Sequence, residues 1–201
     1  MELVATLVKK LPDAKKILQQ VPNRSIVLFP ENVCFDPRTV RKYSQEKNLF
    51  IIYNHDLTIG KKKFIAMDGM DRGKEMWTVR KFNLWHTDYR HYVQAPEPEP
   101  IVSVRGYRSA LVICYDIMKI TCRGRILDVG RQVKKERPML FFVTANWTYN
   151  FGIPQASITT IMNNIKSIRA SVFSSTHGYA LISTKKEKQK ITKKGWISIE
   201  I

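Results

Sequence analysis

Cysteine is scarce in this chain of 201 residues, in which only Cys34, Cys114 and Cys122 occur. An odd number of cysteines, with no CxxC spacing and no Cys/His cluster, argues against both a disulfide framework and a zinc site. The sequence also lacks a glycine-rich phosphate loop and a clustered set of metal ligands, so we expect no cofactor and no metal. A reducing cytosol fits this pattern best.

Long apolar runs are also missing. No run approaches the roughly 20 residues that a membrane helix requires, and Met1-Glu2-Leu3-Val4 lacks the basic flank and cleavage site of a signal peptide. We therefore expect a cytoplasmic protein that does not associate with membranes. Apolar residues make up 44% of the chain, enough for a substantial core, and we expect a single domain over residues 1–201.

Acidic residues are few, because 17 Asp and Glu stand against 34 Lys and Arg, for a net charge of +17. Part of the excess lies in the runs Lys61-Lys62-Lys63, Lys134-Lys135 and Lys193-Lys194. Such a field attracts polyanions in a salt-dependent way, which leaves non-specific binding of nucleic acid open. Lysine runs are more often solvated loops and helix ends, and aromatic residues do not interleave with them as a base-stacking platform requires.

The chain does contain a series of short apolar runs that are typical of strands covered by helices. These predicted strands cover residues 3–8, 25–29, 49–53, 64–67, 76–82, 110–114, 139–144, 172–175, 179–183 and 196–201. Helices are predicted over about 12–20, 36–47, 122–135 and 154–169, the second with Asp36 as N-cap before Pro37. The alternation of strands and helices predicts an α/β sandwich.

Three chemically useful side chains lie where predicted strands end: Glu31, Lys81 and Cys114. They can converge only if those strand ends share one edge of a sheet. A thiol attacks a carbonyl as a thiolate, so it needs a base, and the tetrahedral intermediate needs a group that stabilises its oxyanion. Glu31 can do the first and Lys81 the second. A strand cysteine taken alone is usually a small core residue, but the joint occurrence favours a cysteine hydrolase.

These segments resemble the nitrilase superfamily of carbon–nitrogen hydrolases. The family's strand ending in Pro-Glu is similar to Ile26–Asn32, its nucleophile strand to Leu111–Asp116, and its lysine segment to Arg80–Trp85, with Asn83 in place of histidine. The resemblance continues in the same order through Thr144-Ala145-Asn146-Trp147, Ile168-Arg169-Ala170 and His177-Gly178-Tyr179. It therefore covers almost the whole chain.

The resemblance implies a four-layer αββα sandwich of the nitrilase type with a catalytic triad of Glu31, Lys81 and Cys114. In that mechanism Glu31 alternates between base and acid, Cys114 attacks the carbonyl, and Lys81 stabilises the oxyanion together with the backbone N–H of Tyr115. The resemblance also gives substrate-positioning roles to Asn146 and Trp147.

Many members of the family carry a second carboxylate between the lysine and the cysteine. The spacing leaves three candidates open here, namely Asp88, Glu97 and Glu99. Nitrile-cleaving members tend to have Cys-Trp-Glu where this chain has Cys114-Tyr115-Asp116. This difference favours an amidase or a carbamoylase.

The leading hypothesis is a carbon–nitrogen hydrolase that cleaves a small-molecule amide through a cysteine thioester, and the resemblance implies a homodimer. The alternative is a basic polyanion-binding protein on the same scaffold with a vestigial triad. A cysteine protease needs a histidine partner, and no protease signature surrounds any of the four histidines, His55, His86, His91 and His177.

Overall fold

The computed structural model describes residues 1–31, 33–82, 84, 91–97, 99–117, 121–122, 125–126, 128–146 and 152–201. The strands are β1 (Glu2–Leu7), β2 (Ile26–Leu28), β3 (Phe50–Ile59), β4 (Lys62–Asp71), β5 (Lys74–Arg80), β6 (Ile101–Val104), β7 (Tyr107–Ile113), β8 (Thr121–Cys122), β9 (Arg125–Ile126), β10 (Leu140–Ala145), β11 (Ala170–Ser175), β12 (Ala180–Thr184), β13 (Lys188–Ile191) and β14 (Gly195–Glu200). The helices are α1 (Leu11–Gln20), α2 (Pro37–Glu46), α4 (Asp128–Lys135) and α5 (Gly152–Asn164), with a 3-10 turn, η2, at Cys114–Asp116.

The main strands form two sheets. In the described residues these sheets are connected by strand pairing at one position, between β1 and β11. The first sheet has the order β5-β4-β3-β2-β1-β14 and the second the order β6-β7-β10-β11-β12-β13. They join where Leu7 of β1 pairs with Ser175 of β11. Strands β1, β2, β3, β7, β10 and β11 run parallel to their neighbours in this set, so their carboxyl ends lie together. We call this side of the sandwich the carboxyl edge and the opposite side the amino edge.

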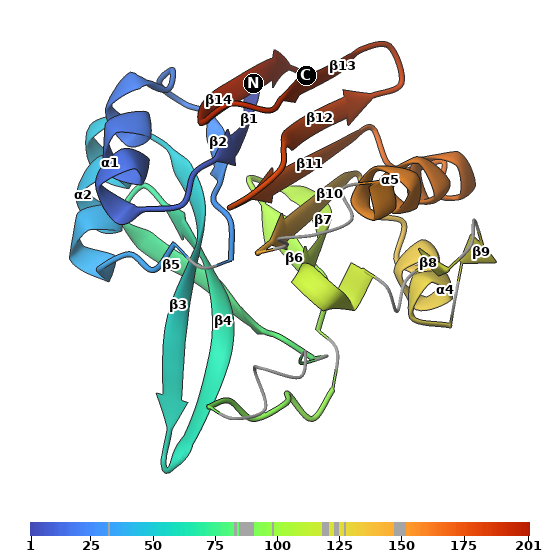
Figure 1. The fold of residues 1–201 in the computed structure, drawn as a ribbon, viewed down its shortest axis with the longest axis horizontal. Coiled ribbons are helices and arrows are strands. Elements are labelled where there is room, and N and C mark those ends of the chain that lie inside the picture. The colour runs from blue at the N-terminus through green and yellow to red at the C-terminus, as the bar shows by residue number, and fades with distance from the viewer. Residues whose placement is uncertain are drawn as a thin grey trace.

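The two sheets pack face to face, and each is covered by helices on its outer face. Residues of β1, β2 and β3 alternate between two cores, because successive side chains of a strand point to opposite faces. The inner core joins both sheets and includes Leu3, Ala5, Leu28, Ile52, Leu111 and Phe142. The outer core packs the first sheet against α1 and α2 through Val4, Val27, Ile51, Ile17 and Val40. Figure 1 shows α1 and α2 on one side of the strands and α4 and α5 on the other, which confirms the αββα sandwich.

Two predicted helices are shorter than expected. The helix predicted over 122–135 begins only at Asp128, because Cys122 and residues 125–126 belong to a short antiparallel pair of strands, β8 and β9. Apolar spacing could not reveal this, because β-branched residues such as Thr121 and Ile126 also suit a strand pair. The helix expected over 154–169 ends at Asn164, although Ile165 and Ile168 beyond it are still buried, as are Ile158 and Ile161 within the helix.

Besides β8 and β9, the strands β6 and β13 were not predicted. β6 pairs with β7 just after the proline-rich segment, and β13 pairs with β12. β13 reads Lys-Gln-Lys-Ile and has no apolar face, as suits an edge strand that must not recruit another chain. β3 and β4 are also longer than predicted and continue past the end of β2 as a two-stranded arm, seen at the bottom of Figure 1.

Arg105 joins the two sheets at the amino edge. It lies in the turn between β6 and β7, and its guanidinium donates hydrogen bonds to the carbonyl oxygens of Arg24 and Asn48 at 2.6 Å and 2.5 Å. It also forms an ion pair with Asp71 at 3.1 Å. Arg24 and Asn48 precede β2 and β3, and Asp71 ends β4, so one side chain ties the β6–β7 turn to the ends of three strands.

None of the helices in the described part of the chain has the length and apolar character needed to cross a bilayer.

Candidate active site

Three of the side chains proposed for catalysis lie at the carboxyl edge. Glu31 follows β2, Lys81 follows β5 and Cys114 follows β7. All three are buried, with exposed fractions of 2%, 2% and 7%. Buried acidic and basic side chains are rare unless they are paired, so this edge differs from an ordinary polar strand end.

Glu31 and Lys81 form an ion pair inside the protein. Lys81 Nζ donates to Glu31 Oε1 at 2.7 Å. The lysine backbone is fixed as well, because its N–H donates to the carbonyl of Ile65 at 2.8 Å. The second carboxylate oxygen, Oε2, is buried and accepts no hydrogen bond of regular geometry from the described residues. One oxygen of Glu31 therefore holds the lysine while the other is left for a further donor.

Cys114 has a strained backbone. Its φ is 48°, in the left-handed region that residues other than glycine rarely adopt. It is the first residue of η2, so the chain turns sharply at the point where β7 ends. Backbone strain of this kind costs of order 1–3 kcal/mol and concentrates at functional sites. In α/β-hydrolases the nucleophile also lies on a strained turn after a strand.

The surroundings of Cys114 raise the pKa of its thiol well above the usual value. Burial is the largest cause, and the charge of Glu31 and a hydrogen bond to its carboxylate act in the same direction. The charge of Lys81 and the backbone N–H of Asn146 oppose them by lowering the pKa. The resting form of Cys114 is therefore a thiol, and the carboxylate of Glu31 lies within hydrogen-bonding reach of it.

Asp116 connects the lysine segment to the cysteine turn. Its Oδ2 accepts a hydrogen bond of 3.3 Å from the backbone N–H of Phe82, the residue after Lys81. Asp116 is two residues after Cys114, so this bond fixes the lysine relative to the nucleophile. The sequence placed Asp116 within a motif but indicated no role for it.

Asn146 lies beside the nucleophile at the end of β10. Its backbone N–H contacts the thiol of Cys114, as its effect on the thiol pKa shows. Its side-chain oxygen accepts a hydrogen bond of 2.5 Å from the hydroxyl of Thr176, which follows β11. Nothing in the sequence pointed to Thr176, because the contact depends on the pairing of β10 with β11.

No protein-family model and no curated protein sequence matches this chain. Among solved structures, the Nesterenkonia AN1 amidase from the nitrilase superfamily superposes with a TM-score of 0.76 at 12% identity, covering 100% of this chain and 90% of that one. The chain has the nitrilase fold. A complex of that amidase with butyramide gives 0.75 at 12% identity, over 100% and 89% of the two chains.

The nitrilase fold also occurs as part of longer proteins among the similar structures. Glutamine-dependent NAD+ synthetase from Acinetobacter baumannii superposes with a TM-score of 0.72 at 13% identity. The match covers 98% of this chain and 44% of the synthetase chain. At these identities the likeness concerns the fold, and the roles of individual residues rest on the geometry above.

Glu97, Glu99 and Tyr115 are the remaining proposed site residues that the structure describes. Glu97 and Glu99 are exposed, so neither described candidate for the second carboxylate is buried beside Lys81. Asp88 and Trp147 lie outside the described residues. Tyr115 belongs to η2, so its backbone N–H directly follows Cys114 in the turn.

Proposed function

We propose that this protein hydrolyses a carbon–nitrogen bond, of an amide or carbamoyl group, in a small molecule. The observation that carries the proposal is the buried Glu31–Lys81 pair beside Cys114, whose thiol lies on a strained turn and is hydrogen-bonded to the Glu31 carboxylate. A buried ion pair is weak support for stability on its own. It is well suited to chemistry that needs a base and a fixed positive charge.

In the first half of the reaction the thiol proton passes to Glu31 as Sγ bonds to the substrate carbonyl carbon. Negative charge develops on the carbonyl oxygen, and Lys81 Nζ and the backbone N–H of Tyr115 stabilise it. Glu31 then gives its proton to the nitrogen, and the C–N bond breaks. The products are ammonia or an amine and a thioester on Cys114.

In the second half Glu31 takes a proton from water, and the hydroxide formed attacks the thioester carbon. The oxyanion forms again beside Lys81, and the C–S bond then breaks. Glu31 returns the proton to the sulfur, so the acid product leaves and the enzyme is restored. One carboxylate thus acts twice as base and twice as acid, in keeping with its single free oxygen.

An amide is a better candidate than a nitrile. The sequence Cys114-Tyr115-Asp116 supports this preference, and so does the fold, since a similar structure is an amidase in complex with butyramide. The homodimer implied by the family resemblance and a cytoplasmic location both stay predictions, the first to be checked by light scattering.

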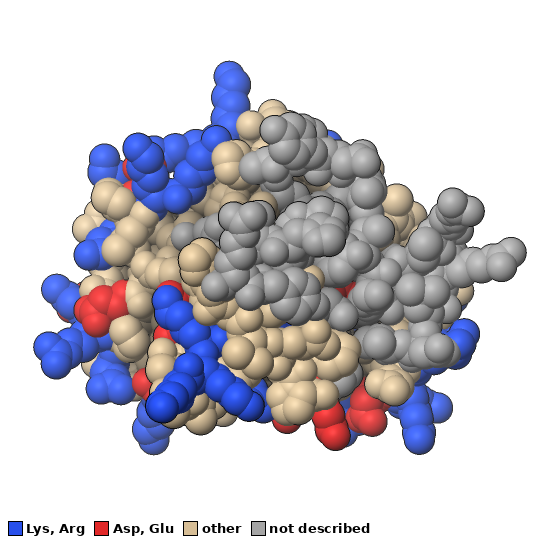
Figure 2. Space-filling model, turned by 60° about the horizontal axis from the view of Figure 1, so that its bottom comes forward, with Lys and Arg blue, Asp and Glu red and all other residues tan. Residues whose placement is uncertain are grey.

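The polyanion-binding alternative also stays a prediction. Figure 2 shows a face on which Lys and Arg side chains outnumber Asp and Glu and gather toward the left and lower edges. A positive surface of this kind fits non-specific attraction of nucleic acid. It gives no reason for burying Glu31 and Lys81 beside a thiol, so the hydrolase is the function we favour.

The proposal is tested by a screen of amides, carbamoyl compounds and nitriles in which ammonia release is measured. We expect release from at least one amide or carbamoyl compound and none from the Cys114→Ala variant. The matched control is Cys34→Ala, because Cys34 is exposed whereas Cys114 is buried. Equal ammonia release by Cys114→Ala and wild type would rule out the thioester mechanism.

A further inference from the structure

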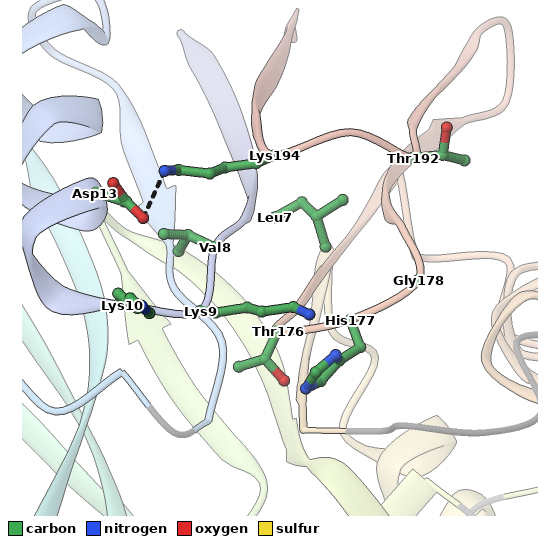
Figure 3. A pocket seen from close by; sticks show the side chains of 10 residues that line it. All are labelled: Leu7, Val8, Lys9, Lys10, Asp13, Thr176, His177, Gly178, Thr192 and Lys194. Atoms are coloured by element: carbon green, nitrogen blue, oxygen red, sulfur yellow. Dashed lines mark ion pairs between the residues drawn. The ribbon is translucent and has the colours of Figure 1, made fainter.

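A pocket separate from the triad lies on the same edge, where β1 and β11 end. Its volume is about 430 Å³, within the roughly 300–1,000 Å³ typical of small-molecule sites. Glu31, Lys81 and Cys114 do not line it. Figure 3 shows the residues that do, which are Leu7, Val8, Lys9, Lys10, Asp13, Thr176, His177, Gly178, Thr192 and Lys194.

The walls of the pocket combine an apolar part with hydroxyl groups. Leu7 and Val8 are 5% and 1% exposed, so they form a firm apolar wall at the end of β1. Thr176 is 3% exposed and already donates to Asn146, which leaves its oxygen lone pairs on the pocket side. A ligand that fits such walls has an apolar body.

The charges that face the pocket do not balance. Three of its lining residues are lysines and Asp13 is its single acid. Asp13 is already neutralised, since its Oδ2 lies 2.6 Å from Lys194 Nζ. No ion pair involves Lys9 or Lys10 within the described part of the chain. Two positive charges therefore remain without an anion.

The unpaired charge of Lys9 acts on the side chain of His177. Figure 3 shows the Lys9 side chain extending across the pocket toward the His177 ring. Burial and the charge of Lys9 lower the pKa of His177 below its usual value. The imidazole is therefore held neutral beside an ammonium group, although it could donate a hydrogen bond to an anion in either state. A bound anion would offset the repulsion.

We propose that this pocket binds a small molecule with an apolar body and an oxyanion head, either carboxylate or phosphate. The head lies between Lys9, Lys10 and His177, and the body packs on Leu7 and Val8. The site adjoins the nucleophile, because Thr176 in its wall bonds to Asn146, whose N–H contacts Cys114. Binding here does not require the hydrolase reaction.

The experiment follows the His177 ring signals by NMR while anions are added, with His177→Gln used to assign them. Phenyl phosphate, benzoate and inorganic phosphate are the probes, so the two head groups and the apolar body are tested separately. We expect a saturable rise in the pKa of His177. Phenyl phosphate should bind about tenfold more tightly than inorganic phosphate, since its ring is removed from water. A non-saturable response, or none, would overturn the proposal.

Charge variants separate this pocket from the general positive surface. Lys9→Ala/Lys10→Ala should weaken phenyl phosphate binding about tenfold or more, whereas Lys193→Ala, which removes a neighbouring charge outside the lining, should not. Equal weakening by both would assign the response to the surface field. Lys9→Ala alone should raise the pKa of His177 without any ligand. Because only binding is measured, an inactive protein gives the same result, so this test stands apart from that of the hydrolase.

Discussion

At the amino edge of the sandwich Arg105 contacts two carbonyl oxygens and Asp71, whereas at the carboxyl edge the Glu31 carboxylate contacts both Lys81 and the thiol of Cys114. Both clusters contain a largely buried ion pair between parts of the chain that are distant in sequence. The first uses its charges to satisfy backbone groups, so it stabilises the fold. The second brings a carboxylate to a thiol, and that contact is what a proton-transfer reaction requires.

The backbone shows the same difference between the two edges. Positive φ values occur at the amino edge for Arg24 (65°), Asn48 (54°) and Arg105 (49°), where tight turns lead into strands. At the carboxyl edge the corresponding residue is Cys114, at 48°. At the arginine and asparagine positions, the positive φ lets the chain turn into a strand. At the buried Cys114, the same conformation sets the direction in which the thiol points.

The largest effects are expected when the triad pair is made neutral. Glu31→Gln/Lys81→Met should lower kcat/KM by about 10³-fold or more, yet leave the free energy of unfolding unchanged or raise it, because buried pairs are often replaceable by neutral groups. Lys81→Met alone should lose about 3 kcal/mol, since it strands a buried carboxylate. Thermal unfolding measures the stability of each variant, and ammonia release measures its kcat/KM. If the double variant were as unstable as Lys81→Met, the ion pair would be needed for the stability of the fold.

Arg105→Ala tests the amino edge. This variant should lower the stability of the protein and leave its turnover nearly unchanged. It leaves the carbonyls of Arg24 and Asn48 and the Asp71 carboxylate without their donor. We expect a loss of about 3 kcal/mol, which corresponds to a drop in Tm of about 6–12 °C, with kcat/KM nearly unchanged below the transition. The matched control is Arg108→Ala, whose exposed pair with Glu136 should contribute little. Loss of turnover in a folded Arg105→Ala protein would contradict the division between the edges.

A smaller effect sharpens the role of the free oxygen. Glu31→Gln removes the charge and the hydrogen bond that raise the pKa of Cys114 and leaves the opposing charge of Lys81 in place. The pKa of the thiol should therefore fall. Thiolate absorbance followed against pH, in a Cys34→Ala background with Cys114→Ala subtracted, measures the midpoint. An unchanged or higher midpoint would mean that Glu31 does not act on the thiol.

The smallest effect concerns His55, which lies on β3 beyond the end of β2 and 3.1 Å from Asp68. Hydrogen bonding to Asp68 is the main cause that raises the pKa of His55. Its contribution to stability is therefore complete below the unfolded pKa of about 6.5 and is lost as pH rises through the folded pKa. His55→Gln should cost up to about 1 kcal/mol near pH 5.5 and less near pH 8.5. Chemical denaturation at both pH values measures this, and equal losses at the two values would contradict the assignment.

The convergence of Glu31 with Cys114 could be predicted because each follows an apolar run that forms a strand. β2 and β7 run in the same direction, so their ends share an edge. β13 could not be predicted in this way, since its Lys-Gln-Lys-Ile sequence has no apolar face. Asp116 and Thr176 were missed because their partners are backbone and side-chain groups on distant segments.

The anion pocket gave no sequence signal. Lys9 and His177 are far apart in the chain and meet only because Leu7 pairs with Ser175. A pairing between parallel strands leaves no local pattern, unlike a hairpin with its turn residues. The run of apolar residues that predicts β1 does not indicate which strand lies beside it.

The pairing of β1 with β14 has a consequence for how the protein is made. Residues 2–7 lie against residues 195–200 in antiparallel register, so the first sheet stays incomplete until residues 195–200 have left the ribosome. Contacts of such long sequence separation slow folding. During synthesis β1 exposes an edge that a foreign strand can occupy. We therefore expect the nascent chain to depend on chaperones more than a protein whose neighbouring strands are made in succession.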